Sequence, residues 1–194
     1  MALLRMGRKA AAIFLLACGL WAAPGALAAT ARTPEKDLEY GLKAAFLFNF
    51  AKFVDWPPAA FEPAAPFTLC VFGDDPFGAV LDSTVAGEAV AGRPIAVRRG
   101  TRIADLKGCH ILFVSRAERG RLPEVLAAVR GGNALTVGES DGFLADGGMI
   151  RFYLEANKVR FAVNLAAVER SPLKISSKLL RLARVSPEPE GTPR

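Results

Sequence analysis

The residue types that usually carry catalysis or bind metals are scarce in this sequence. Its 194 residues include 1 His and 3 Cys. A histidine-rich metal site, a two-histidine proton relay and a zinc ribbon each need more of these residues than the chain has. Neither the G-x-G-x-x-G pattern nor the Walker pattern of phosphate-binding loops is present in the sequence. The commonest metal and nucleotide sites are therefore excluded.

The remaining candidates for chemistry are a serine, the single histidine and two aspartates. Ser115 follows a predicted strand, but Val114-Ser115-Arg116 is no nucleophile elbow, and His110 is interpreted as a strand-end residue. Asp141 and Asp146 flank a glycine-rich turn and are interpreted as turn formers. We therefore expect no catalytic residues, no metal ligands and no cofactor, and we interpret the protein as a non-enzyme.

One segment has the position of an anion-binding loop. Gly73–Gly78 lies where a predicted strand meets a predicted helix, and backbone N–H groups at such a helix start can hold a phosphate. Asp74 and Asp75 bring negative charge to this segment, which opposes phosphate. We expect a capped helix start instead, with Asp75 as the N-cap and Pro76 at the first helical position.

The N-terminal segment has the organisation of a secretory signal peptide. Basic residues at positions 5, 8 and 9 precede an apolar run over 10–23, and Ala26-Leu27-Ala28 supplies small residues for cleavage. The run is shorter than the roughly 20 residues that a membrane-spanning helix needs. We expect residues 1–28 to be a signal peptide and the mature protein to be periplasmic. Acylation of Cys18 in a lipoprotein is the alternative.

Export changes what the net charge implies about partners. The whole chain carries 25 Lys+Arg against 19 Asp+Glu, a net charge of +6, and its signal segment holds three of the basic residues and no acidic ones. The mature protein therefore has a net charge near +3, in a compartment without DNA. We expect no nucleic-acid partner.

Two cysteines remain after the signal segment. Because disulfides persist outside the cytoplasm, we expect Cys70 and Cys109 to form one. A redox-active pair is the alternative, but the Cys-x-x-Cys spacing typical of such pairs is missing. We interpret the bridge as structural.

The order of predicted elements indicates an α/β protein. Helical and strand patterns alternate from residue 37 to about 137, which favours a largely parallel sheet with right-handed crossovers. Two strictly alternating segments, 149–155 and 158–164, then predict an antiparallel hairpin around Ala156-Asn157. We expect one Rossmann-like domain over 37–185, a mostly parallel sheet with that hairpin near the C-terminus and helices on both faces. A lead-in at 29–36 and a disordered tail at 186–194 flank this domain. The expected elements are helices at 37–54, from 75, at 119–129 and within 171–184, and strands at 67–72, 94–98, 110–114 and 134–137.

The hairpin is predicted to have one apolar and one polar face. Alternate residues point to opposite sides of a strand. The apolar face would hold Ile150, Phe152, Leu154, Val159, Phe161 and Val163, and the polar face Arg151, Glu155, Arg160 and Asn164.

The first helix is unusually apolar. Between Ala44 and Val54 its only polar residues are Asn49 and Lys52, and phenylalanines occupy positions 46, 48, 50 and 53. A surface helix normally shows a wider polar face. Either this helix is buried against its own sheet, or Phe48 and its neighbours form, with Trp56, an apolar patch for a partner.

The predicted C-terminal helix offers a second surface. Its basic residues fall on one stripe and its apolar residues on another. A solvated basic face and a docking surface for an acidic partner or anionic lipid headgroups are the two interpretations. The basic stripe is Lys174, Lys178, Arg181 and Arg184, and the apolar one is Ile175, Leu179 and Leu182.

Four ordered blocks of the sequence resemble the YfiR family of bacterial periplasmic proteins, over about residues 37–185. They are YGLKAAFLFNFAKFVDWP at 40–57, CVFG at 70–73, CHILF at 109–113, and NKVRF at 157–161 continuing through LKISSKLL at 173–180. The resemblance implies a compact α/β fold, a homodimer in the periplasm, and restraint of an inner-membrane diguanylate cyclase through its periplasmic sensor domain. It also implies a second, redox-responsive disulfide, which two mature cysteines cannot supply. Other members could serve histidine kinases or transporters instead.

These observations lead to one main hypothesis and one rival. The main hypothesis is a periplasmic regulator that binds and restrains a membrane-anchored sensor protein, most directly a diguanylate cyclase. The rival is a periplasmic protein that binds a small molecule in a cleft near Trp56 and the polar face of the hairpin. For either kind of binding, the predicted apolar anchors are Phe48, Phe53 and Trp56, and the predicted polar contacts are Arg160, Glu169 and Lys174.

Overall fold

A computed structural model describes residues 33–186 of the chain. These residues lie in one compact unit. The predicted signal peptide, Cys18, residues 29–32 of the lead-in and residues 187–194 of the tail lie outside the described residues, while Ser186 ends the last strand.

The apolar helix near the N-terminus forms as expected. It is α1, Pro34–Phe53, with proline in its first turn and Glu35 and Asp37 near the helix N-terminus, where negative charge is favourable. The helix gives way to a short strand, Val54–Asp55 (β1), and the following Trp56-Pro57 cannot continue a helix.

The centre of the fold is an eight-stranded sheet in the order β10-β8-β7-β6-β5-β2-β4-β3. The five strands β7, β6, β5, β2 and β4 are parallel to one another, whereas β8 is antiparallel to β7 and β3 is antiparallel to β4. The predicted α/β class and mostly parallel sheet are therefore confirmed. The sheet strands are Phe67–Phe72 (β2), Ala89–Val90 (β3), Arg93–Gly100 (β4), Ile111–Val114 (β5), Leu135–Gly138 (β6), Ile150–Glu155 (β7), Lys158–Asn164 (β8) and Arg184–Ser186 (β10).

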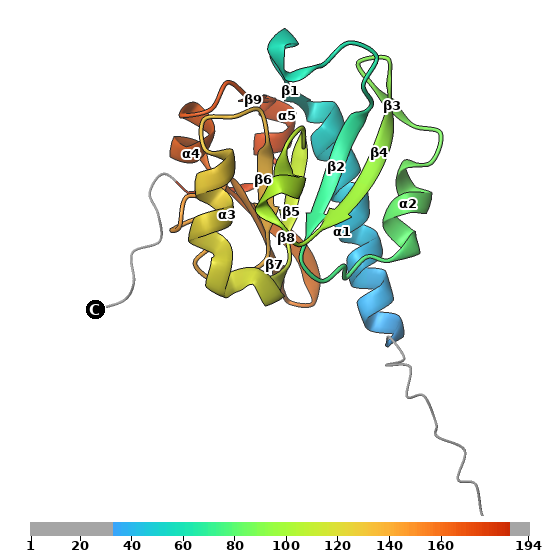
Figure 1. Ribbon diagram of the computed structural model, residues 1–194. Helices are drawn as coiled ribbons and strands as arrows, with labels where there is room; N and C mark the ends of the chain where they lie inside the picture. The colour runs from blue at the N-terminus through green and yellow to red at the C-terminus, as the bar shows by residue number, and fades with distance from the viewer. Residues whose placement is uncertain (1–32, 187–194) are drawn as a thin grey trace, which may run out of the picture. The chain divides into compact units, whose positions relative to one another are not determined.

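Helices cover both faces of this sheet, as predicted (Figure 1). On one face, α1 packs with α2 (Ala79–Val85) and α5 (Ser177–Leu180) over a large apolar cluster that includes Phe50, Phe113 and Phe161. On the other face, α3 (Leu122–Val129) packs over a smaller cluster around Leu112 and Phe143. A five-residue helix, Leu165–Glu169 (α4), follows β8. Short 3-10 helices lie at Pro58–Ala60, Ile103–Leu106 and Arg116–Arg121.

The expected disulfide is present. Cys70 on β2 and Cys109 just before β5 are bridged, with their Cα atoms 5.8 Å apart. Both cysteines are buried in the cluster under α3, and the guanidinium of Arg98 lies 3.2 Å from the Cys109 Sγ. The bridge thus ties together two adjacent parallel strands.

The single histidine has a structural position. His110 is buried, stacks against Phe61 and Phe67, and its Nδ1 accepts the backbone N–H of Thr68 at 3.0 Å. Burial, as the largest cause, lowers the pKa of His110 below its usual 6.5. These contacts agree with the strand-end interpretation.

A pH dependence of stability follows from His110. Below about pH 6.5 the unfolded chain takes up a proton that the folded chain resists, so the free energy of unfolding should fall from pH 7 toward pH 5.5. Urea titrations at several pH values measure this slope. His110→Asn, whose side-chain oxygen can still accept the Thr68 N–H, should flatten it. An equal slope in both proteins would contradict the assignment.

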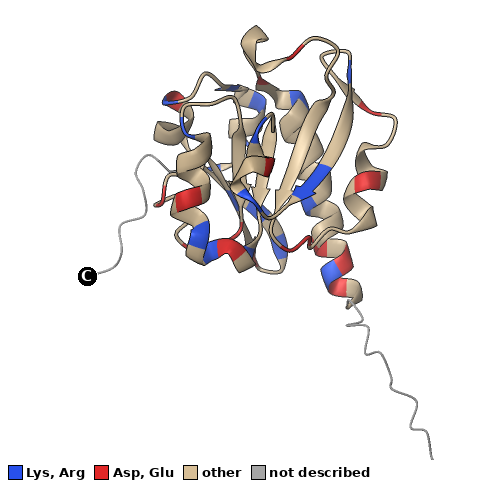
Figure 2. Ribbon diagram, in the orientation of Figure 1, with Lys and Arg blue, Asp and Glu red and all other residues tan. Residues whose placement is uncertain are grey.

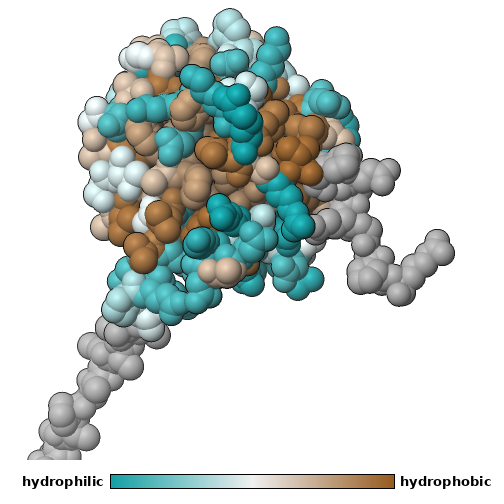
Figure 3. All heavy atoms as spheres, turned by 180° about the vertical axis from the view of Figure 1, so that it is seen from behind, coloured by the Kyte–Doolittle hydropathy of each residue, from teal (hydrophilic) through white to brown (hydrophobic). Residues whose placement is uncertain are grey.

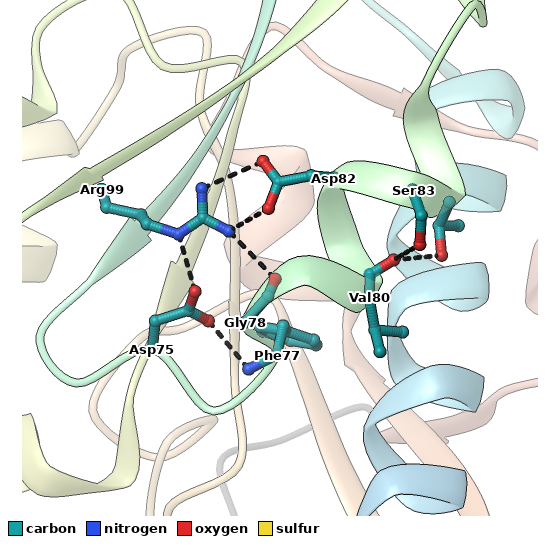
Figure 4. A network of polar contacts seen from close by, with 8 residues as sticks. Asp75, Phe77, Gly78, Val80, Asp82, Ser83 and Arg99 are labelled. Atoms are coloured by element: carbon teal, nitrogen blue, oxygen red, sulfur yellow. Dashed lines mark hydrogen bonds and ion pairs between the residues drawn. The ribbon is translucent and has the colours of Figure 1, made fainter.

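The second helix begins later than predicted. Asp75 does not cap α2; its carboxylate accepts the N–H of Phe77 at 2.8 Å and the Nε of Arg99 at 2.6 Å. Arg99 also binds Asp82 and the carbonyl of Gly78, the residue that precedes α2 (Figure 4). The Arg99 side chain thus holds the loop and the first turn of α2 together. The helix begins at Ala79, three residues after the predicted first helical residue, Pro76.

The C-terminal segment also differs from the prediction. Residues 171–184 do not form one long helix: Lys174–Ile175 is a strand (β9), α5 covers Ser177–Leu180, and Arg184 begins β10. The predicted basic stripe is therefore divided among three elements. Pairing of β9 with β1 and of β10 with β8, neither visible in local periodicity, accounts for the difference.

The hairpin has the predicted register and turn. Ile150 pairs with Val163 and Leu154 with Val159, around Ala156-Asn157, where both residues have positive φ. Two side chains depart from the expected faces. Leu154 is 53% exposed, and Asn164 is buried because its side chain caps α4.

Candidate functional site

A two-stranded ribbon brings three of the predicted binding residues into one region. Val54 pairs with Ile175 and Asp55 with Lys174, and the backbone N–H of Ser176 donates to the carbonyl of Phe53. Phe53, Trp56 and Lys174 therefore lie around the end of α1. We call these three residues the α1-end surface.

The side chains of the α1-end surface combine apolar and charged groups. Phe53 is 37% exposed and Lys174 is exposed. Trp56 is half-buried: its ring packs edge-on against Phe67, and its indole N–H donates to the carbonyl of Asn133 at 3.1 Å. The indole is therefore held in one orientation, with part of its surface left in solvent.

A hollow of about 320 Å³ lies beside Trp56. Its lining includes Lys52, Asp55, Phe61 and the β3 residues Ala89 and Val90. The polar face of the hairpin does not contribute to it, so of the two features in the rival hypothesis only Trp56 lines this hollow. Its volume is at the lower end of small-molecule sites.

Phe48 lies farther back on α1 and is half-buried. The ammonium of Lys52 lies 4.1 Å from the centre of its ring, and Lys52 also pairs with Glu88 at 3.4 Å. Phe48 is thus partly covered by a flexible charged side chain. It can contribute to the α1-end surface only if Lys52 moves.

The other two predicted polar contacts lie elsewhere. Arg160 is on β8, opposite Tyr153, with its Nε 3.9 Å from the carboxylate of Glu155. Glu169 ends α4, and α4 contacts β9, the strand that carries Lys174. The structure brings Phe53, Trp56 and Lys174 together and leaves Arg160 on the hairpin.

A buried ionic cluster was not anticipated from the sequence. Lys43 of α1 is 3% exposed and pairs with Glu139, which is 5% exposed and follows β6, at 2.5 Å. Lys43 also pairs with Glu39, and Tyr40 donates its hydroxyl to Glu139 at 3.0 Å. Burial, together with the Glu139 carboxylate, raises the pKa of Tyr40 above its usual 10.

This cluster occupies the edge of the sheet where Rossmann-like proteins usually bind ligands. Glu139 directly follows the carboxyl end of β6, and Ser115 and Gly73 follow the carboxyl ends of β5 and β2. Here the chain places its own Lys43 and Tyr40 at that edge. The arrangement fixes α1 onto the sheet, and nothing in it resembles the phosphate-binding loop of a nucleotide site.

A second apolar surface was also missed. Leu38, Leu42 and Leu154 are 68%, 46% and 53% exposed and line one small hollow with Val159. We call these three leucines the leucine surface; an apolar group reaches the surface near the start of α1 in Figure 3. The i, i+4 spacing of Leu38 and Leu42 places them on one stripe of α1, and this spacing was the signal in the sequence that could have indicated the surface.

Charged residues of both signs are spread over the described residues. Acidic and basic residues are interspersed in the view of Figure 2, without a large region of one sign. Within residues 33–186 no three acidic, histidine or cysteine side chains are grouped so as to hold a metal ion. None of the helices in that range is both long and apolar enough to cross a membrane. What the α1-end and leucine surfaces can do is bind another molecule through apolar contact flanked by charge.

Comparison with protein-family models supplies the family of the chain. The model for YfiR/HmsC-like proteins matches residues 40–184, from the first turns of α1 to the start of β10. This family consists of periplasmic, non-catalytic regulators of cyclic di-GMP signalling. The match covers most of the sequence and nearly all of residues 33–186, and we conclude that the chain belongs to the YfiR/HmsC-like family.

Proposed function

We propose that this protein binds the periplasmic sensor domain of an inner-membrane signalling protein, most directly a diguanylate cyclase, and holds it in an inactive state. The observation that carries the proposal is the α1-end surface, where an exposed Phe53, an indole held in one orientation and an exposed Lys174 lie around the end of α1. Family membership supports a regulatory role in cyclic di-GMP signalling. The homodimer and the periplasmic signal peptide stay predictions.

The α1-end surface has the composition of a protein-binding site. Aromatic residues dominate the energetics of such sites because each buries a large area at a small cost in side-chain entropy. Phe67 and the carbonyl of Asn133 already hold the Trp56 side chain in one orientation, so this side chain loses little conformational entropy when a partner binds. Lys174 at the rim can select an acidic partner surface.

To restrain a cyclase, the protein only needs a higher affinity for the inactive state of the sensor domain than for its active state. If the α1-end surface contacts the inactive sensor domain better than the active one, binding shifts the equilibrium of the partner toward the inactive state. A tenfold shift needs about 1.4 kcal/mol of differential binding energy, which is within what one buried aromatic residue provides. The protein needs no chemistry of its own for this role.

Crosslinking and co-purification test the proposal. Tagged mature protein should recover one membrane sensor protein from envelope extract, and Phe53→Asp should reduce this recovery at least tenfold because it places a charge in an apolar contact. Leu182→Asp is the matched control, since Leu182 is 68% exposed on a different segment. Equal recovery by wild type, Phe53→Asp and Leu182→Asp would reject the α1-end surface. Loss only in Leu42→Asp would move the interface to the leucine surface.

The small-molecule alternative rests on the hollow beside Trp56. Trp56 is the one tryptophan within the described residues, so its fluorescence reports on that hollow. Saturable quenching by a periplasmic metabolite, retained in the purified protein without any partner, would favour this alternative over the regulator.

A further inference from the structure

A hollow with no part in the α1-end surface lies beside α3. It measures about 680 Å³ and lies between α3, the turn at 145–147 and α4. Figure 1 shows α4 beside the end of α3. Its volume is in the range of sites for small organic ligands.

The floor of this hollow is mostly apolar. Leu126 and Val129 of α3 face Met149 and Ala167 across it. The one polar residue of the floor, Thr136, already accepts the N–H of Met149 through its hydroxyl at 3.0 Å. A ligand body on this floor would therefore be apolar.

The rim of the hollow carries two exposed arginines. Arg130 directly follows α3 and Arg170 directly follows α4, and neither side chain forms an ion pair with another residue of 33–186. Asp146 is the one acidic residue in the lining, and the hydroxyl of Ser171 is occupied by the carbonyl of Val168. The rim therefore has an excess of positive charge next to an apolar floor.

We propose that the hollow between α3 and α4 binds a small amphiphile with one carboxylate head and a short apolar body. Guanidinium groups bind carboxylates through paired N–H donors, and the body would cover the side chains of Leu126 and Val129. An arginine after a helix is also favourable by itself, because the C-terminal end of a helix carries partial negative charge. This helix-end explanation predicts no ligand, so an experiment can distinguish it from the proposed ligand site.

The probes are 1-anilinonaphthalene-8-sulfonate, a fluorescent apolar anion, and decanoate as competitor. Wild-type protein should bind the fluorescent probe saturably, and decanoate should displace it. Arg130→Ala/Arg170→Ala should weaken the decanoate-displaceable binding at least tenfold. Arg181→Ala is the matched control, because Arg181 is likewise an exposed arginine at the end of a helix, α5, and does not line the hollow. It should bind as wild type does.

A second variant separates loss of the site from loss of the fold. Ala145→Phe places a ring at the exposed edge of the hollow and should block binding while the midpoint of urea unfolding stays unchanged. Equal displaceable binding in wild type and the double arginine variant would overturn the proposal. So would arginine-dependent sedimentation with phosphatidylglycerol vesicles in the absence of decanoate binding, because the anion would then belong to a membrane surface.

Discussion

Replacing Lys43 by alanine should lower the free energy of unfolding by about 3–5 kcal/mol, because it leaves the buried carboxylate of Glu139 without its cation. Tyr40 would remain as the one hydrogen-bond donor from α1 to that carboxylate. The loss should appear as a lower midpoint in urea unfolding with an unchanged slope. The lysine thus holds the helix that ends at the α1-end surface.

Two further variants make this prediction specific. Lys52→Ala breaks an ion pair with Glu88 whose side chains are 44% and 43% exposed, and it should cost less than about 1 kcal/mol. Lys43→Met/Glu139→Met removes both buried charges and should recover much of the stability lost in Lys43→Ala. A cost for Lys43→Ala no larger than that for Lys52→Ala would show that the pair does not hold α1 to the sheet.

Removing the disulfide should have an effect of similar size. Cys70→Ala/Cys109→Ala releases a link between residues 39 apart in sequence, and the unfolded chain should gain entropy worth roughly 4 kcal/mol. Urea unfolding of the oxidised wild type and of the double variant measures the difference. Arg98→Ala, which removes only the guanidinium beside the sulfur atoms, should cost much less.

The same variant tests whether the bridge is structural. The bridge lies under α3, whereas Phe53 and Trp56 are attached to α1 on the other face of the sheet. At a temperature where the double variant is fully folded, it should recover the membrane partner as well as wild type does. Loss of recovery from a folded, bridge-free protein would instead indicate redox control of binding.

The local sequence pattern was sufficient to predict the elements that depend on residues close to them in the chain. The β2 prediction, 67–72, matches the observed bounds, and the hairpin around Ala156-Asn157 has the expected register, because alternation and turn chemistry are both local. The Cys70–Cys109 bridge followed from export and the count of two mature cysteines. By contrast, β9 and β10 form only because β1 and β8 offer them edges, so a short basic segment was mistaken for a helix.

The residues around the candidate site show a similar division. The aromatic pattern of α1 was compatible with burial against the sheet and with an apolar patch for a partner. In the structure Phe46 and Phe50 pack on Phe152 and Phe161 in the core, and Phe53 lies at the surface. Burial of Lys43 depends on Glu139, which lies 96 residues away, and no spacing rule connects them. Leu154 alternates correctly with its neighbours, yet it is 53% exposed beside Leu38 and Leu42 near the start of α1, a packing outcome that alternation does not determine.

The proposed function requires that the α1-end surface contacts a membrane sensor protein. Its most direct test places a photo-crosslinking amino acid at position 53 in cells and identifies the attached protein by mass spectrometry, with position 182 as the matched exposed control. If the α1-end surface binds the partner, position 53 should form one dominant adduct with a membrane-anchored sensor protein, and position 182 should not form it. No adduct from position 53, or the same adducts from both positions, would contradict it.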